Sequence, residues 1–472
     1  MRAAWAALAL CALYAAPGTV SAGPVSAEPE LGTALREPHE TQVDPFLTDL
    51  EQRTFRFFWE TANPKNGLIP DRYPTPSHAS IAAVGFGLTA YPIGVERDYI
   101  SRTDAQRRVL ATLRYFASAT NEHGFYYHFI DMRSGARASD SEISTVDTAL
   151  LLAGMLFCED YFNSQDPRDI EIRKLTSEIY RRVDWKWAQP RPPAVALAWT
   201  PESGFSGDDW RGYNEAMLVY LLALGSPTHP IDPQAWTQWT STYGNHWGTL
   251  YDQTYLSFGP AFGHQYTHVW VDFRGIRDAY MREHGLDYFE NSRRATYTQR
   301  RYAIANPKHW QAYGKNVWGM SASDGPGPLP EPSLGQRPFL QYAARGVGLG
   351  RIVDDGTIAP TAAISSLPFA PEIVLPATLE MYRRFGSSIY SSYGFLDAFN
   401  ASVRNSSRAG DAGWVDADYV GIDEGPILAM IENYRSDLVW RVMRSDPYLQ
   451  HGLERAGFSG GWLAQPQLTQ PQ

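Results

Sequence analysis

Cysteine is scarce in this sequence. The 472 residues include only two cysteines, Cys11 and Cys158. Cys11 lies in an N-terminal segment that we expect to be removed, which leaves Cys158 as the single cysteine of the mature chain. One thiol cannot form an intramolecular disulfide, and its place after the apolar run 150–157 predicts a buried core residue. The folded chain must therefore be stabilised by its core and not by cross-links.

Positive charge and long apolar runs are also lacking. The formal net charge of −10 leaves no basic excess to neutralise phosphates, which argues against nucleic acid as a partner. After the N-terminus, no stretch approaches the ~20 apolar residues that a membrane span needs. A hydrophobic content of 44% with 19% charged residues is typical of a globular protein.

The N-terminus predicts a secretory signal peptide. Arg2 supplies the positive start, residues 3–16 are apolar, and Val20-Ser21-Ala22 resembles a cleavage site, although cleavage as late as residue 27 also fits. We therefore expect a periplasmic or secreted protein that does not bind membranes after signal removal, and that is a monomer. The predicted organisation is a signal peptide (1–22), a disordered leader (23–43), one domain (44–460) and a flexible tail (461–472).

Several sequence motifs of known chemistry are missing. The chain has no G-x-x-x-x-G-K phosphate loop, no H-E-x-x-H and no paired C-x-x-C. Among the 11 histidines, His264 and His268 are four residues apart, but no predicted element clearly covers both. We therefore expect neither a cofactor nor a metal.

The most informative stretch is residues 208–222, in which a polar and aromatic loop leads into an apolar helix. Glu215 falls where the two meet, in the expected first helical turn, flanked by Trp210 and Tyr213. A carboxylate fixed beside aromatic rings suits an acid catalyst that acts on a sugar. The simpler alternative is that Glu215 only complements the helix dipole, as acids in first turns commonly do.

The same arrangement recurs at residues 141–154, where polar residues and acids again precede an apolar run. Ser144 and Asp147 fit a capping box, in which Ser144 accepts a hydrogen bond from the third helical N–H and Asp147 reaches back. This structural explanation accounts for Asp147 but not for Glu142.

Loops with acids and aromatic residues precede apolar helices near residues 77, 144, 214, 269, 371 and 424, and amphipathic helices lie between them. Alternating inner and outer helices predict an all-α (α/α)6 toroid with long loops over one end, where the inner helices would start. Several carboxylates at one rim suit glycoside hydrolysis, which needs a proton donor and a second carboxylate. The expected rim acids are Glu142, Asp147, Glu215, Glu372, Asp423 and Glu424.

The chain resembles the bacterial glycoamylase-like family that includes endo-β-1,2-glucanases. The similarity extends from about residue 45 to 458. Its motifs include Arg53 to Trp59, Ser80 to Leu88, Ser141 to Gly154, Asn214-Glu215-Ala216-Met217, Asp272 to Ile276, Trp318 to Pro326, Pro368 to Glu372 and Gly421 to Arg435.

The resemblance implies hydrolysis of glucans, with β-1,2-glucan as the expected substrate, by an inverting and metal-free mechanism. It also implies that Glu215 is the general acid and that Asp147, with Glu142 nearby, is essential. One departure stands out, because this chain has Glu424 where the family motif leads us to expect glutamine. Glu424 would add a charge if it faced the cleft.

The residues that we expect to bind the substrate come from these loops and motifs. Trp59, Trp210, Trp270 and Trp318 are candidate stacking faces, although tryptophan is more often a core residue. The polar and remaining aromatic candidates are Arg72, Tyr213, His268, Asp324, Glu372 and Glu424. The alternatives that stay open are an exo-acting enzyme, a hydrolase of another glucan linkage including α-glucan, and a sugar-binding toroid without catalysis.

Overall fold

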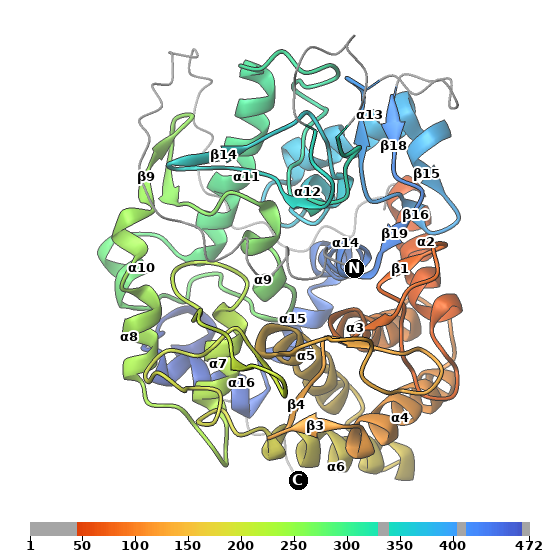
Figure 1. Ribbon diagram of the computed structural model, residues 1–472, viewed down its shortest axis with the longest axis vertical. Coiled ribbons are helices and arrows are strands. Elements are labelled where there is room, and N and C mark those ends of the chain that lie inside the picture. The colour runs from red at the N-terminus through yellow and green to blue at the C-terminus, as the bar shows by residue number, and fades with distance from the viewer. Residues whose placement is uncertain (1–44, 329–338, 404–411, 465–472) are drawn as a thin grey trace.

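The computed structural model of the protein describes residues 45–328, 339–403 and 412–464. Helices alternate along the chain between an inner ring and an outer layer, which is the expected (α/α)6 toroid (Figure 1). The inner helices are α3 (Ile81–Glu96), α5 (Thr145–Tyr161), α7 (Met217–Gly225), α9 (Tyr266–Trp270), α12 (Pro360–Ile364) and α14 (Gly421–Ser436). The outer helices are α2 (Pro45–Thr61), α4 (Arg102–Ser118), α6 (Pro167–Arg182), α8 (Gln234–Thr240), α11 (Tyr288–Ala305) and α13 (Pro371–Ile389).

Shorter helices complete the fold. They are α10 (Ala279–Glu283), α15 (Leu438–Met443), α16 (Pro447–Arg455) and the 3-10 helices η1 (Tyr243–Asn245), η2 (Ala261–His264) and η4 (Gly461–Ala464). η4 occupies the start of the segment expected to be a tail, and Trp462 there donates from Nε1 to the carbonyl of Asp272 at 2.8 Å. The predicted signal peptide and leader, and residues 465–472, lie outside the described residues. Within the described ranges, we find no helix with the length and apolar character of a membrane span.

Small residues allow α3 and α5 to pack closely, as the sequence of α3 predicts for an interior helix. A Cβ atom at Gly85 would lie 2.3 Å from the carbonyl oxygen of Leu150, and one at Gly154 would lie 2.1 Å from that of Gly85. No side chain fits between two backbones at this distance, so glycine is required at both positions. The predicted core thiol is also confirmed, since Cys158 on α5 is buried and donates to the carbonyl of Leu88.

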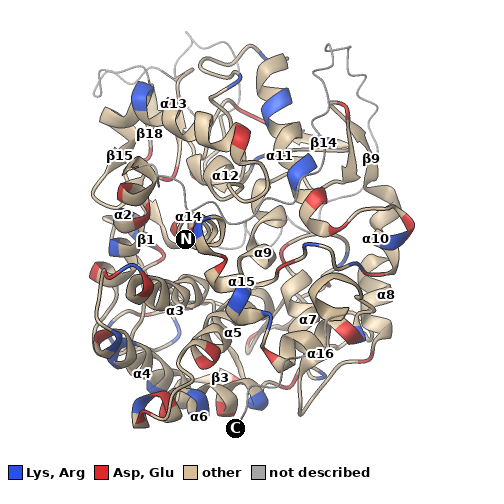
Figure 2. Cartoon of the chain, turned by 180° about the vertical axis from the view of Figure 1, so that it is seen from behind, with Lys and Arg blue, Asp and Glu red and all other residues tan. Residues whose placement is uncertain are grey.

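The outer helices are amphipathic. On α4, Val109, Leu113 and Phe116 are fully buried at helical spacing. The outer helices α4 and α6 show many charged residues, whereas the inner helix α3 shows almost none (Figure 2). The outer layer therefore carries much of the charged surface, whereas α3 of the inner ring is nearly all apolar.

Short antiparallel strands connect the loops at the end where the inner helices begin. Three of these small sheets come directly before inner helices: β1–β19 before α14, β2–β5 before α3, and β6–β7–β8 before α5. In the first, Arg72 pairs with Val420 and Tyr73 with Tyr419. The strands are β1 (Arg72–Tyr73), β2 (Ala79–Ser80), β3 (Asn121–Glu122), β4 (Phe125–Tyr126), β5 (Phe129–Ile130), β6 (Ile143–Ser144), β7 (Ala198–Thr200), β8 (Gly204–Phe205), β9 (Trp247–Leu250), β10 (Gln253–Leu256), β11 (Ala322–Ser323), β12 (Ala343–Ala344), β13 (Gly346–Gly348), β14 (Arg351–Val353), β15 (Tyr390–Ser391), β16 (Gly394–Phe395), β17 (Phe399–Asn400), β18 (Trp414–Val415) and β19 (Tyr419–Val420).

Two expected helix starts differ from the structure. Helix α7 begins at Met217, so Glu215 lies in the turn before the helix and not in its first turn. Pro371 begins the outer helix α13, and the corresponding inner helix is α12, which starts at Pro360. Inner and outer helices of the toroid run in opposite directions, so the start of an outer helix lies at the end of the toroid away from the inner starts.

Candidate functional site

The first turn of α5 and the loops that precede it bring His128, Glu142 and Asp147 together. His128 Nδ1 lies 2.8 Å from Oε1 of Glu142, and its Nε2 lies 3.5 Å from Oδ1 of Asp147. The predicted cap is confirmed, since the Asp147 N–H donates to Ser144 Oγ at 3.2 Å, and Asp147 reaches back to Ser144, although its carboxylate accepts from the Ser144 hydroxyl and not from the backbone N–H of a full capping box. The cap therefore fixes Asp147 while its other oxygen faces His128.

The charge of this group follows from its contacts. Burial tends to lower the pKa of His128, but Asp147, Glu142 and Asp71 together raise it to about 9. Burial tends to raise the pKa of Glu142, but the hydrogen bond and the charge of His128 hold it below its usual value. At neutral pH, His128 is thus an imidazolium and Glu142 a carboxylate.

A second group, which we call the acid cluster, consists of Asp71, Asp324, Asp397, Asp416 and Asp423. The Arg72 guanidinium donates to Asp324 and lies 3.4 Å from Oδ2 of Asp71. The Asp324 N–H donates to Oδ2 of Asp397 at 2.7 Å. Asp71 also contributes to the charge around His128, so the two groups adjoin.

Burial and mutual repulsion keep part of the acid cluster protonated. The pKa of Asp423 rises to about 7, first through burial and then through Glu424 and Asp324. The pKa of Asp416 also rises to about 7, through burial, Asp397 and Asp324. Burial and the neighbouring Asp423 raise the pKa of Asp397 well above its usual value. The cluster can therefore hold and exchange protons near neutral pH.

Glu215 joins this assembly from the opposite side of the ring. It is buried, and its backbone carbonyl accepts from Thr267 Oγ1 at 3.3 Å. The phenol of the neighbouring Tyr266 has a pKa raised first by burial and then by charges that include Asp423 and Glu215. Asp147 and Asp423 lie in the first turns of the inner helices α5 and α14, and Glu142 and Glu215 lie just before α5 and α7, so these four predicted acids share one end of the toroid.

The two aromatic residues beside Glu215 in the sequence do not reach the cleft. Trp210 is 2% exposed and donates from Nε1 to Thr145 Oγ1 at 2.9 Å. Tyr213 is buried against Tyr288 and shares hydrogen bonds with His264 and Ser292. Their prediction as substrate-binding residues is corrected, because packing between neighbouring helices covers both rings.

The predictions that Trp59 and Trp270 stack on the substrate are also wrong. Trp270 is fully buried, stacks on Phe86 with ring centroids 5.1 Å apart, and donates to Thr89. Trp59 is half-buried on the outer helix α2, where the Arg108 guanidinium covers its ring at 4.3 Å. Neither ring is free to stack on a sugar.

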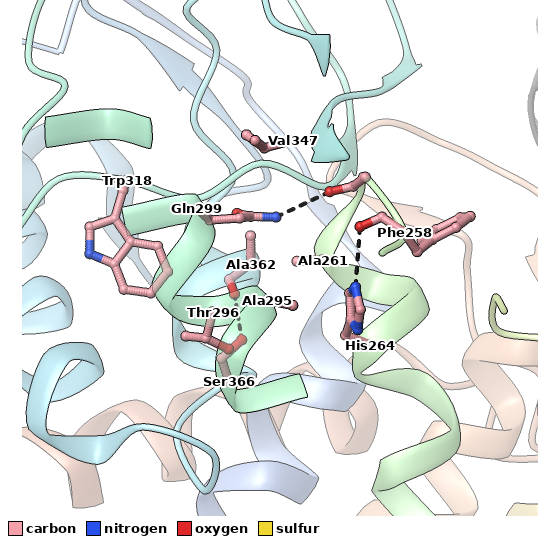
Figure 3. A pocket seen from close by; sticks show the side chains of 11 residues that line it. Phe258, Ala261, His264, Ala295, Thr296, Gln299, Trp318, Val347, Ala362 and Ser366 are labelled. Atoms are coloured by element: carbon pink, nitrogen blue, oxygen red, sulfur yellow. Dashed lines mark hydrogen bonds between the residues drawn. The ribbon is translucent and has the colours of Figure 1, made fainter. Parts of the chain in front are cut away.

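Trp318 lines a small internal cavity with Thr296, Gln299, His264 and Ser366 (Figure 3). The cavity volume is about 10 Å³, which holds about one water molecule. A sugar ring does not fit, and Trp318 itself is 1% exposed. The expectation that Trp318 stacks on the substrate is therefore also corrected.

The predictions that the polar residues His268, Glu372 and Glu424 bind the substrate are also wrong. His268 is buried, bonds to Ser292 and has a pKa lowered well below its usual value by burial. Glu372 starts the outer helix α13 and pairs with Arg293 at 2.7 Å, so it lies at the other end of the toroid. Glu424 is buried beside Thr54 of α2, because successive residues of α14 face different sides and Asp423 takes the side towards the acid cluster.

Several residues of the site were not predicted from the sequence: Asp71, His128, Tyr266, Asp397 and Asp416. Asp71 directly precedes the predicted Arg72, so it had a local signal. Asp397 lies within an apolar stretch and had none, because only the pairing of distant loops brings it to Asp324.

Asp324, Asp397 and Asp416 offer oxygens that all lie within 4.8 Å of one another, the spacing of a possible cation site. Arg72 already neutralises Asp324, and the raised pKa values of Asp397 and Asp416 supply protons for the other two. The donor set therefore does not require an ion. That the chemistry needs no metal or cofactor stays a prediction.

The chain is similar to known proteins over most of its length. It is 30% identical over 465 residues to an exo β-1,2-glucooligosaccharide sophorohydrolase of Parabacteroides distasonis, covering 89% of this chain and 60% of that protein. It is 28% identical to an endo-β-1,2-glucanase of Chitinophaga pinensis in complex with sophorotriose and glucose, covering 89% and 99% of the two chains with a TM-score of 0.77. A candidate glucoamylase from Bacteroides uniformis is 31% identical, covering 90% and 100%, with a TM-score of 0.78.

The chain thus spans only 60% of the length of the curated relative. Residues 208–447, just over half of the sequence, match the glycoamylase family. This segment includes Glu215 and most of the acid cluster. Together with the (α/α)6 fold, these matches show that the chain belongs to the glycoamylase family.

Proposed function

We propose that this protein is a glycoside hydrolase that cuts β-1,2-glucan internally and with inversion. The observation that carries the proposal is the placement of four acids, Glu142, Asp147, Glu215 and Asp423, in the first turns of inner helices or just before them, at the loop end of the toroid. The names of two relatives, a β-1,2-glucanase and a β-1,2-glucooligosaccharide hydrolase, support this substrate.

In the proposed mechanism, Glu215 gives its proton to the glycosidic oxygen as the bond from this oxygen to the anomeric carbon breaks. A water molecule attacks the anomeric carbon from the opposite face and loses a proton to Asp147, directly or through a relay that includes Glu142. One displacement of this kind inverts the anomeric centre. His128 is an imidazolium at neutral pH and has no nitrogen free to accept a proton, but it contacts both Glu142 and Asp147 and so positions the two carboxylates.

Asp423 is a second candidate for the base. It lies close to Tyr266, as Glu215 does, and its pKa of about 7 suits a group that takes up a proton at neutral pH. Substitution of Asp147 and of Asp423 in turn separates the two assignments, because only loss of the true base should be rescued by a small external nucleophile such as azide.

An exo-acting enzyme is the second candidate function, because the relative from Parabacteroides distasonis releases sophorose from non-reducing ends, as its name states. The decisive experiment is incubation of the purified protein with linear β-1,2-glucan, with products sized over time. A ladder of oligosaccharides supports internal cleavage, and a single disaccharide from the start supports exo action.

The anomeric form of the first product, read by NMR, tests inversion in the same reaction. If β-1,2-glucan gives no product, a panel of other linkages, including α-glucan, is the next step. Binding of a glucan without new reducing ends would instead indicate a sugar-binding toroid.

We also propose that the protein is exported to the periplasm or the exterior and acts there as a monomer on its glucan. Arg2 and the apolar residues 3–16 support export. Fractionation of expressing cells, followed by N-terminal sequencing of the mature protein, tests both export and the cleavage site.

A further inference from the structure

A surface hollow of about 370 Å³ lies beside the site and is lined by residues of β1, β15, β19, the end of α13 and adjoining turns. Figure 1 shows these strands and α13 on one side of the molecule. Its volume falls within the range of small-molecule binding sites. The hollow is lined by aromatic, serine and other neutral residues, and no charged residue of the described chain lines it. The proposed mechanism does not use it.

The hollow is joined to the acid cluster by one strand. Arg72 and Tyr73 are consecutive in β1, and neighbouring side chains of a strand point to opposite faces. Arg72 reaches Asp324 of the acid cluster, whereas Tyr73 lines the hollow. A ligand in the hollow is therefore separated from the acid cluster by the width of this strand.

Tyrosine rings form one wall. Tyr73 is 41% exposed, one of the few large aromatic side chains with so open a face. Its ring centroid lies 5.7 Å from that of Tyr393, at an interplanar angle of 71°. Tyr393 packs in turn on Tyr419 at 5.3 Å and donates to Glu60 at 3.1 Å. Tyr393 is thus fixed by its contacts with Tyr419 and Glu60. It packs against Tyr73, whose ring remains exposed to solvent.

Hydroxyl groups also line the hollow. They come from Ser387 and Ser388 at the end of α13, Ser391 in β15 and Ser392 in the turn after it. Ser391 and Ser392 are exposed, which places their hydroxyls at the surface. Aromatic faces together with neutral hydroxyls suit a ligand with apolar C–H faces and many hydroxyls, and the absence of charge in the lining disfavours an ionic ligand.

We propose that this hollow binds a gluco-oligosaccharide segment, as a holding site for the part of a glucan chain that lies beyond the cleft. The class of ligand rests on the proposed function, whereas the site itself rests on the neutral aromatic and hydroxyl lining. Binding here would raise the affinity for long chains without any contact to the reacting bond.

The test uses two substitutions of the hollow and one matched control. Tyr73→Ala removes the exposed aromatic ring. Ser388→Trp fills the hollow and leaves the residues of β1 unchanged. Tyr434→Ala is the control, because Tyr434 is a tyrosine of similar exposure (40%) that does not line the hollow. Each change is made in the full-length protein and, for binding, together with Glu215→Gln to prevent hydrolysis.

Calorimetry with linear β-1,2-glucan should show binding about tenfold weaker for Tyr73→Ala and Ser388→Trp, and unchanged for Tyr434→Ala. In the active protein, the ratio of kcat/KM for the polymer to kcat/KM for its trisaccharide should fall by a similar factor for the two hollow variants only. If Tyr73→Ala does not fold, Ser388→Trp gives the same test.

The outcomes separate this proposal from the proposed function. Hydrolysis with unaltered binding and an unaltered ratio in both hollow variants would overturn the holding site and leave the enzyme. Glucan binding that the two variants weaken, without hydrolysis by the parent protein, would support the site and overturn the enzyme. Neither binding nor hydrolysis of any neutral glucan would overturn both.

Discussion

The imidazole of His128 lies 2.8 Å from the carboxylate of Glu142, and this contact links the loop after β4 to the loop before α5. It also explains a residue that helix capping could not, since Glu142 takes no part in the cap of α5. Because the other nitrogen of His128 lies 3.5 Å from Oδ1 of Asp147, the same imidazole also helps to position the carboxylate that we propose as the base.

Replacement of Glu215 by glutamine should lower kcat at least ~10²-fold, because glutamine cannot donate the proton that the leaving oxygen needs. Release of reducing ends from β-1,2-glucan measures the effect. Glu372→Gln is the matched control, since Glu372 lies at the other end of the toroid and should leave the rate unchanged. Full activity of Glu215→Gln would remove Glu215 from the mechanism.

The His128 pair should make stability depend on pH. Its folded pKa of about 9 is above the ordinary value of 6.5, so its contribution is complete below pH 6.5 and is lost as the pH rises through about 9. The expected loss is on the order of 3 kcal/mol. Urea unfolding of the parent and of His128→Gln at both ends of this range measures it. If the free energy of unfolding changed equally with pH in the two proteins, His128 would not contribute to the pH dependence.

Asp423→Asn should stabilise the fold while it lowers activity. The pKa of Asp423 is raised from its ordinary value of 3.8 to about 7, mainly by burial, so stability falls as the pH rises from about 4 to about 7 and the full penalty remains above pH 7. Asparagine removes the penalty, and the melting temperature should rise above pH 7 and change little near pH 4, where Asp423 is protonated in the folded state. A variant that is less stable than the parent at high pH would contradict this account.

Gly85→Ala should destabilise the protein by about 1–3 kcal/mol, since its Cβ would overlap the backbone of Leu150. Gly244→Ala is the control, because a Cβ at Gly244 meets no atom within 4 Å. Chemical unfolding of the two variants compares them. A change at Gly85 no larger than at Gly244 would show that the α3–α5 contact can relax.

The local features of the chain were readable from the sequence because they depend on neighbouring residues. The small residues of α3 predicted an interior helix, and Ser144 with Asp147 predicted a cap, as the structure shows. Glu215 was placed at the right junction, although the helix begins two residues later. The predictions that aromatic residues such as Trp210 and Trp270 bind the substrate were wrong, because a ring near an acid in the sequence can face either the cleft or the core.

The sequence by itself determined the alternation of apolar and amphipathic helices, and with it the toroid and the end at which most of its acids gather. Helix periodicity and loop composition are local properties, so one chain read in order is enough to show them. Only the tertiary structure decided which carboxylates meet. Arg72, Asp324 and Asp397 come from three distant loops, and the pKa of Asp397 is raised by burial and by the charges of Asp423 and Asp324. It also decided that Asp423 and not Glu424 faces this group, because the packing of α14 against α2 fixes which side of the helix each residue takes.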